Sequence, residues 1–311
     1  MINPEERSGD SPHTIGVFDS GFGGLTVLRA LIARLPQARF VFIGDTARLP
    51  YGSKSRRTIA RYAAQSAQFL VNEQGAEFLV IACNTASALA LDAIQEAVSV
   101  PVLGMIEPGA EAARAASRTG DVLVIATVAT VESHAYAAAC RARGLRALEK
   151  ACPLLVPLVE EGWTWPLIAA GTLIESSAAQ DASAPPQVAV TAEVIRIYLD
   201  ELNAEAAAQG MNPDTLVLGC THYPLLRPLI EKAVPAGMRV IDSAEAAAEA
   251  AVRLFNGDAK QQTGKQKSGE PSPNTQYLRC FATDSVEKFE RLGSRFLNQP
   301  TGKVDLVDLG G

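Results

Sequence analysis

The sequence predicts an α/β protein with two halves, each built on a parallel sheet, that face each other across a central cleft. Apolar runs of strand length alternate with helical patterns along the chain, which is typical of parallel sheets. Two of these runs end in similar loops, FLVIACNTASAL at residues 78–89 and LVLGCTHYPLL at residues 216–226. Each places a cysteine directly after a buried strand, at the edge where open α/β sheets bind ligands. We therefore expect one cysteine loop in each half, on opposite sides of the cleft.

Composition and charge restrict the class of protein. The 311 residues are enough for about two domains. A formal net charge of −6 provides no general basic surface for nucleic acid. The sequence shows neither a signal peptide nor an apolar run near the roughly 18 residues of a membrane span, so we expect a cytoplasmic protein that does not bind membranes. Five cysteines without a secretory signal favour free thiols over disulfides.

The first half begins after a polar arm. This arm, residues 1–13, contains two prolines and is predicted to be flexible. The expected elements are a strand at 14–18, a helix over 25–35, a strand at 39–43, a helix over 55–74, a strand from 78, a helix over 86–98, a strand ending near Met105 and a helix after Pro108. The chain is expected to cross into the second half at this last helix.

The second half continues the alternation and is followed by a return to the first. The expected elements are a strand from 121 and its helix, an apolar segment from 152 that ends at Glu160 and Glu161, a helix over 188–208, the second cysteine strand, a strand and helix over 238–257, and a final strand, helix and strand over 276–309. Residues 163–187 are interpreted as an insertion, and residues 258–275 as a disordered linker. The predicted domains are residues 14–107 plus 243–311, and residues 108–242.

A glycine-rich turn, DSGFGGLTV at residues 19–27, follows the first strand. Glycines at such a turn let backbone amides approach a ligand, and helix N-termini favour anions. A nucleotide site is an alternative, because Asp45 follows at about the distance expected of a ribose-binding acid. The third glycine of the dinucleotide fingerprint would fall on Thr26, however, so this alternative fails in detail.

The motifs DSGFGGLTV, DTARLPYG, ACNTAS, PLVEEG and LGCTHYPLL, in this order, resemble those of glutamate racemase. The resemblance spans roughly residues 14–257, with a weaker likeness at FATDSVEKF. It implies two pseudo-symmetric, doubly wound domains that bind L- or D-glutamate between them without a cofactor or metal. It also implies a role in bacterial cell-wall biogenesis, the supply of D-glutamate for peptidoglycan. A homodimer is left open.

The resemblance also assigns roles to individual residues. It implies that Cys83 and Cys220 are the two catalytic acid/bases and that Asp19 and His222 assist them. Glu160 matches an auxiliary carboxylate, although a solvated helix-end charge is an equal alternative. The implied substrate contacts are Asp19, Ser20, Tyr51, Gly52, Asn84, Thr85, Thr221 and His222.

The residues themselves support this chemistry. Inverting an α-carbon needs a base on one face and an acid on the other, and the two roles must swap in the reverse direction. Two thiols on opposed loops meet that requirement. A thiol has an ordinary pKa of about 8.5, so neighbours must take up its proton before it acts as a base. His222 and Asp19 are the candidates for moving these protons.

Other interpretations of the cysteine loops remain open. A strand-end cysteine is most often buried packing. A zinc site using Cys83, Cys220 and His222 would not have the spacing of a usual structural zinc site. In a cysteine hydrolase, Cys220 would attack a carbonyl with His222 as base, which leaves the other cysteine loop without a role. A racemase specific for aspartate or a hydantoin, and a regulatory binding protein, are further alternatives. Cys140, Cys152 and Cys280 are interpreted as structural.

Overall fold

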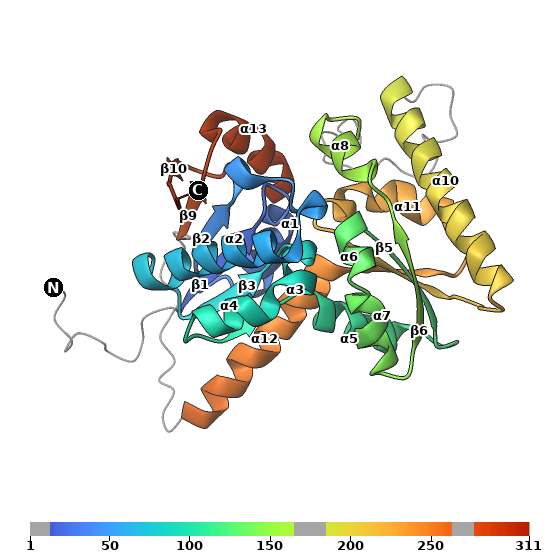
Figure 1. Ribbon diagram of the computed structural model, residues 1–311, viewed down its shortest axis with the longest axis horizontal. Coiled ribbons are helices and arrows are strands. Elements are labelled where there is room, and N and C mark those ends of the chain that lie inside the picture. Colours follow the sequence, from blue (N-terminus) through green and yellow to red (C-terminus); the bar gives the residue numbers. More distant parts are fainter. Residues whose placement is uncertain (1–12, 165–184, 263–276, 311) are drawn as a thin grey trace, which may run out of the picture.

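The computed structural model describes residues 13–164, 185–262 and 277–310, and these residues form two parallel sheets flanked by helices (Figure 1). The first sheet has the order β10-β9-β2-β1-β3-β4 and the second has the order β6-β5-β7-β8. Every strand pair in both sheets is parallel. The predicted α/β class with two parallel-sheet units is therefore confirmed.

The strands of both sheets are short. Those of the first are β1 (Thr14–Asp19), β2 (Arg39–Gly44), β3 (Phe78–Ile81), β4 (Val102–Leu103), β9 (Leu278–Ala282) and β10 (Val304–Leu306). Those of the second are β5 (Asp121–Ala126), β6 (Arg146–Ala151), β7 (Thr215–Gly219) and β8 (Arg239–Asp242). The last strands of the chain thus return to the first sheet, as the sequence predicts. The exact residue limits of the two domains stay a prediction.

The helices connect the strands and cover the sheets. They are α1 (Leu25–Arg34), α2 (Arg56–Gln68), α3 (Asn84–Leu89), α4 (Leu91–Ala97), α5 (Ile106–Ala116), α6 (Val128–Glu132), α7 (Ala135–Arg141), α8 (Leu155–Glu160), α10 (Pro186–Ala208), α11 (Arg227–Ala233), α12 (Ser243–Gln262) and α13 (Val286–Leu297). Short 3-10 turns lie at η2 (Thr46–Arg48), η3 (Tyr51–Ser53) and η5 (Tyr223–Leu226), and a π-type turn lies at η4 (Phe69–Glu73). Within the described residues, no helix combines the length and apolar character that crossing a bilayer requires.

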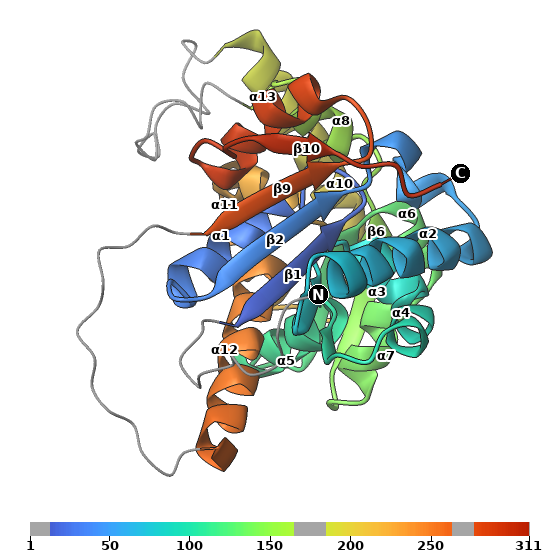
Figure 2. The same cartoon turned by 90° about the vertical axis from the view of Figure 1, so that its left-hand side faces the viewer.

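Alternation along β1 shows how the first sheet is covered on both faces. Ile15 and Val17 belong to a core that includes residues of α1, α12 and α13. Phe18 belongs to a core with residues of α2 and α4 on the opposite face (Figure 2). Successive strand side chains point to opposite faces, so an almost continuously apolar strand is required here. The first core also contains Leu216 and Leu218 of β7, so it extends from one sheet to the other.

The structure corrects several expected elements. Strand β6 was missed, because the charged residues of RALEKA hide a half-buried strand at the edge of the second sheet. The helix expected over 86–98 is two helices with a break at Ala90. Helix α5 starts at Ile106, so Pro108 lies inside its first turn, where a missing amide costs no helical hydrogen bond. The helix after β5 is interrupted at His134, which has a left-handed backbone conformation.

The predicted insertion and linker fall largely outside the described residues. Residues 165–184 of the insertion, 263–276 of the linker region and 1–12 of the arm are not described. Helix α12 continues to Gln262, past the expected start of the linker at residue 258, and the disordered linker itself stays a prediction. Gly257 does not end the helix, because one glycine lowers helix stability by only about 1 kcal/mol.

Candidate active site

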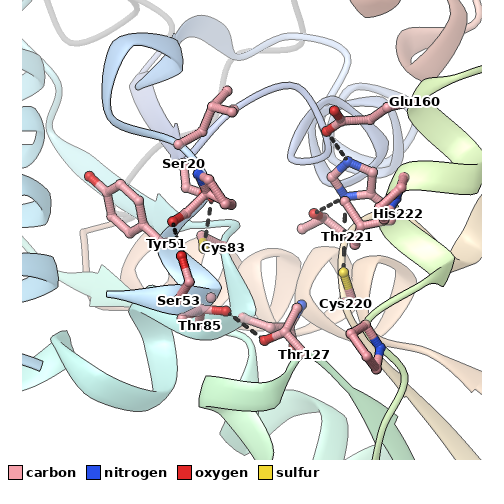
Figure 3. Close-up of a pocket in the computed structure, with 18 of the residues that line it drawn as sticks. Ser20, Tyr51, Ser53, Cys83, Thr85, Thr127, Glu160, Cys220, Thr221 and His222 are labelled. Carbon is pink, nitrogen blue, oxygen red and sulfur yellow. Dashed lines mark hydrogen bonds and ion pairs between the residues drawn. The ribbon is translucent and has the colours of Figure 1, made fainter. Parts of the chain in front are cut away.

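A cavity of about 400 Å³ lies between the carboxyl-terminal edges of the two sheets (Figure 3). Its volume is within the range of small-molecule sites. All residues predicted for the site line it: Asp19, Ser20, Tyr51, Gly52, Cys83, Asn84, Thr85, Glu160, Cys220, Thr221 and His222. They meet because the loops that carry them follow parallel strands, whose carboxyl ends share one edge of each sheet.

Cys83 lies at the start of α3, directly after β3. Its Sγ accepts a hydrogen bond from the amide of Ala86 at 3.4 Å and donates one to Ser20 Oγ at 3.4 Å. Burial and then the charge of Asp19 raise the pKa of the Cys83 thiol to about 12. The thiol is therefore protonated at neutral pH, and it needs a nearby proton acceptor to become a base.

Asp19 is the last residue of β1, the strand that pairs with β3. Among the charged side chains, it acts most strongly on the Cys83 thiol. Burial raises the pKa of its carboxyl group, although amides of the glycine turn and the charge of His222 lower it in part. One carboxylate oxygen, Oδ2, accepts a hydrogen bond from the amide of Gly21 at 2.9 Å. A carboxylate with a raised pKa is a better base than an exposed one, so Asp19 is suited to exchange a proton with Cys83.

The surroundings of Cys220 differ, because an imidazole takes the place of the carboxylate. His222 Nδ1 lies 3.9 Å from Cys220 Sγ, and Nε2 lies 3.0 Å from Glu160 Oε1 on α8 (Figure 3). Burial lowers the pKa of His222, but its hydrogen bonds to Cys220 and Glu160 outweigh burial and raise it to about 10. In turn, burial raises the pKa of Glu160, and the bond to His222 lowers it overall. The three side chains form a continuous path for a proton.

Glu160 is held in place. Its side chain is 21% exposed and is engaged with His222, so the structure does not show the solvated charge that was the sequence alternative. The geometry places a carboxylate behind the imidazole, where it fixes the ring orientation and stabilises its charged form.

Polar groups of the first half line the cavity next to Cys83. The amide oxygen of Asn84 accepts a hydrogen bond from the hydroxyl of Tyr136 at 2.7 Å. Its nitrogen Nδ2 is buried and has no hydrogen-bond partner among the described residues. An unpaired buried donor costs free energy, so Nδ2 gains a hydrogen bond if an acceptor enters this polar part of the cavity.

Tyr51 and Gly52 both line the cavity. The Tyr51 hydroxyl donates to Asp45 and points away from the other labelled side chains (Figure 3). Any contact of Tyr51 with a ligand therefore uses its ring or backbone. Asp45, which was considered for a ribose, also accepts hydrogen bonds from Arg48 and Thr283. Asp45 thus anchors the loop and does not line the cavity.

Some lining residues were not predicted for the site. Thr127 forms hydrogen bonds with Thr85 at 2.9 Å and with Thr130 at 2.9 Å, so hydroxyls from both halves meet at the cavity wall. Cys152 lines the cavity directly after β6, although it was interpreted as structural. Its position directly after a strand would have indicated Cys152 as a lining residue, but strand β6 was not recognised in the sequence. Thr127 could have been found as the N-cap of α6.

The loop after β7 in the second half packs closely against the glycine-rich turn of the first half. A Cβ atom at Gly23 would lie 2.2 Å from Thr221 Oγ1 and 2.6 Å from the His222 ring. Thr26 Oγ1 donates a hydrogen bond to the carbonyl of Thr221 at 2.9 Å. Gly21 lines the cavity, but its amide donates to Asp19 Oδ2, whereas Gly23 serves this close approach between the halves.

The described residues contain no group of three or more His, Cys, Asp or Glu side chains arranged to hold a metal ion. The zinc alternative therefore gains no support from the geometry of Cys83, Cys220 and His222.

Comparisons with known proteins agree on one family. Residues 23–162 match the family model described as Asp/Glu/Hydantoin racemase. The chain is 48% identical to glutamate racemase of Koribacter versatilis, over 96% of this chain and 98% of that protein. Crystal structures of glutamate racemases have the same fold: isoform RacE1 from Bacillus anthracis (TM-score 0.77, 33% identity) and the Francisella tularensis protein in complex with D-glutamate (TM-score 0.76, 31% identity). In both cases the likeness covers 96% of this chain and 98% of the other.

Proposed function

Since this chain belongs to the glutamate racemase family and is an amino-acid racemase, we propose that it interconverts L- and D-glutamate by two-base proton transfer, with Cys83 and Cys220 as the bases. The observation that carries the proposal is the arrangement of the cavity. Of the three thiols that line it, Cys83 of the first half and Cys220 of the second each have a neighbouring group for moving a proton, Asp19 for Cys83 and His222 for Cys220.

The steps of the proposed reaction balance protons on both faces of the α-carbon. From L-glutamate, the Cys220 thiolate removes the α-proton while His222 holds the proton that the thiol has lost. The Cys83 thiol then donates its proton to the opposite face, which gives D-glutamate and leaves Cys83 as a thiolate. From D-glutamate the same two transfers run in reverse, so the Cys83 thiolate is the base and the Cys220 thiol is the donor. Asp19 relays the proton between Cys83 and solvent when the free enzyme converts between its two protonation forms. Neither direction consumes a metal or cofactor.

The substrate is proposed to lie with its carboxylates among donors of the cavity wall. Asn84 Nδ2 and the hydroxyls of Thr85 and Thr221 are donors on this wall. Such donors stabilise the charge that builds on the α-carboxylate as the α-proton leaves. The structure of the Francisella tularensis relative contains D-glutamate, which supports glutamate as the substrate. We further propose that the product D-glutamate supplies peptidoglycan synthesis.

Single cysteine variants test this mechanism. We expect purified protein to racemise L-glutamate without added cofactor, and circular dichroism can monitor this reaction. In heavy water, the product should carry solvent deuterium at the α-carbon. Cys83→Ala and Cys220→Ala should each abolish racemisation in both directions. A β-chloroglutamate needs only one base, because chloride leaves from Cβ after deprotonation and the resulting enamine hydrolyses to 2-oxoglutarate and ammonia.

The two variants should therefore separate by configuration. Cys220→Ala should still eliminate from the analogue that is D at the α-carbon, and Cys83→Ala from the L analogue. Elimination from neither analogue in one variant, or product without solvent deuterium, would contradict two separate bases. The hydrolase alternative has no role for Cys83. It therefore predicts that the Cys83→Ala variant still hydrolyses a glutamate ester and releases the carboxylic acid.

A further inference from the structure

An aromatic side chain of the C-terminal helix packs against the imidazole of His222. The ring centroids of Phe296, on α13, and His222 are 5.1 Å apart with an interplanar angle of 82°, an edge-to-face contact. Phe296 is 0% exposed and belongs to the large core that joins both sheets. Its ring is therefore fixed by packing, and it can fix what it touches.

This contact crosses from one half of the molecule to the other. His222 follows β7 of the second sheet, whereas α13 packs on α1 beside the first sheet (Figure 1). On another side the ring lies against Gly23, where a Cβ would come within 2.6 Å. His222 is thus seated between two elements of the first half, while its nitrogens face Cys220 and Glu160 of the second.

We propose that Phe296 is a positioning residue for proton transfer at Cys220, which rests on the two-base function proposed above. The aromatic edge-to-face contact keeps the imidazole in the rotation that directs Nδ1 to Cys220 and Nε2 to Glu160. Glu160 holds Nε2 at 3.0 Å, but the contacts of Nδ1 are longer, 3.4 Å to Thr221 Oγ1 and 3.9 Å to Cys220 Sγ. Hydrogen bonds therefore fix the Nε2 end of the ring more tightly than the Nδ1 end that faces Cys220. Packing supplies the missing constraint.

The proposal predicts an effect on one half-reaction only. Cys83 has a separate set of partners, Ser20, Ala86 and Asp19, and these do not include His222 or Phe296. Full racemisation cannot reveal such asymmetry, since enantiomers have an equilibrium constant of 1 and kcat/KM must fall equally in both directions. Elimination from the two β-chloroglutamate configurations removes this restriction, because each uses one base.

The test compares two leucine variants of the same helix. Phe296→Leu removes the ring against His222, and Phe289→Leu removes an equally buried ring that packs on Phe22 and Phe42. We expect Phe296→Leu to lower kcat for elimination from the L analogue about tenfold, a fraction of the usual contribution of general acid–base catalysis. Elimination from the D analogue should stay within about twofold, the spread expected of an indirect effect. Phe289→Leu should change both analogues to the same extent.

Several outcomes would overturn the proposal. Equal loss on both analogues in Phe296→Leu would indicate a general structural role, and no loss on either would indicate that packing does not set the ring. If Phe296→Leu does not fold, as judged by its thermal transition, Phe296→Met offers a longer, flexible side chain that adapts to the space without an aromatic ring, and it should show the same split. The base assignment is checked separately: L-analogue elimination by Cys220→Ala would refute the two-base function, whatever Phe296→Leu does.

Discussion

Cys83 and Cys220 are both 5% exposed, yet different groups surround them. Burial and the charge of Asp19 raise the pKa of the Cys83 thiol, so a carboxylate must accept its proton. Cys220 instead faces an imidazole that is itself bonded to Glu160. A racemase of this design need not be chemically symmetric, although its overall reaction is. The two sides should therefore respond differently to the loss of a single charge.

Glu160→Gln tests this at the imidazole. Bonds to Glu160 and Cys220 raise the pKa of His222 to about 10 despite its burial. A neutral glutamine stabilises the imidazolium less, so the pKa of His222 should fall. Because the mechanism needs protonated His222 when L-glutamate binds, the loss of kcat/KM at high pH should move to lower pH by about one unit. The pH profile of kcat/KM for elimination from the L β-chloroglutamate measures the shift, and the profile for the D analogue should not move.

Glu161→Gln is the matched control for that profile. Glu161 lines the same cavity on the neighbouring position, but no hydrogen bond joins it to His222 among the described side chains. In Glu161→Gln, kcat/KM should fall at the same high pH as in the wild type. An unchanged profile in Glu160→Gln would show that Glu160 does not govern the protonation of His222.

The hydroxyl of Tyr136 has a predicted effect on substrate binding. It donates to Asn84 Oδ1 and so holds Nδ2 free for a substrate carboxylate. Tyr136→Phe should raise KM for glutamate about fivefold, since one hydrogen bond contributes about 1 kcal/mol, with a smaller change in kcat. Tyr223→Phe, which removes a buried hydroxyl bonded to Ala126 and Cys152, should lower stability without raising KM. Steady-state kinetics and thermal unfolding separate the two results.

At the level of elements, the sequence predicts best where local pattern and tertiary role agree. The strands before Cys83 and Cys220 are buried on both faces, so their apolar runs are unmistakable. Strand β6 lies at the edge of its sheet and is only half-buried, so its charged residues mask it. The helix break at Ala90 lies where α3 and α4 both pack on α2. Such packing cannot be predicted from the helix propensities of neighbouring residues.

The same distinction explains the site. Residues in the strand-end loops could be predicted, because the fold brings all such loops to one edge. The contact between Phe296 and His222 could not, since it joins residues from different elements and both halves. Cys152 could not be predicted as a lining residue for a different reason, because strand β6, which precedes it, was not recognised in the sequence.

The glycine turn between β1 and α1 gives a prediction about how elements meet. Gly23→Ala would place a methyl group 2.2 Å from Thr221 Oγ1 and 2.6 Å from the His222 ring. The Cys220 loop must then move away, and a displacement of about 1 Å can reduce the rate about 100-fold. We expect a strong loss of kcat with a thermal transition that is still cooperative. Racemisation at the wild-type rate would show that the two halves do not close as tightly as this contact implies.

On the scale of the whole molecule, the cavity exists only because both sheets contribute to it. Hydrogen bonds from Thr26 to Thr221 and between Thr85 and Thr127 connect the halves around it. All five cysteines are free and buried. Three of them, Cys83, Cys152 and Cys220, line the cavity, so a thiol reagent reaches these by the same route as the substrate. Cys140 and Cys280 do not line it, and reagents reach them only through unfolding.

The order of alkylation follows from this arrangement. Burial raises the pKa of Cys83 and Cys152 to about 12, so both thiols react slowly at neutral pH. Cys220 has His222 beside it to accept its proton, and iodoacetamide should modify Cys220 first, with loss of racemisation in proportion. Saturating glutamate should protect it by filling the cavity. Peptide mapping by mass spectrometry gives the order, and His222→Asn should abolish the preference for Cys220. Inactivation through Cys140 or Cys280 alone would place the reaction outside the cavity.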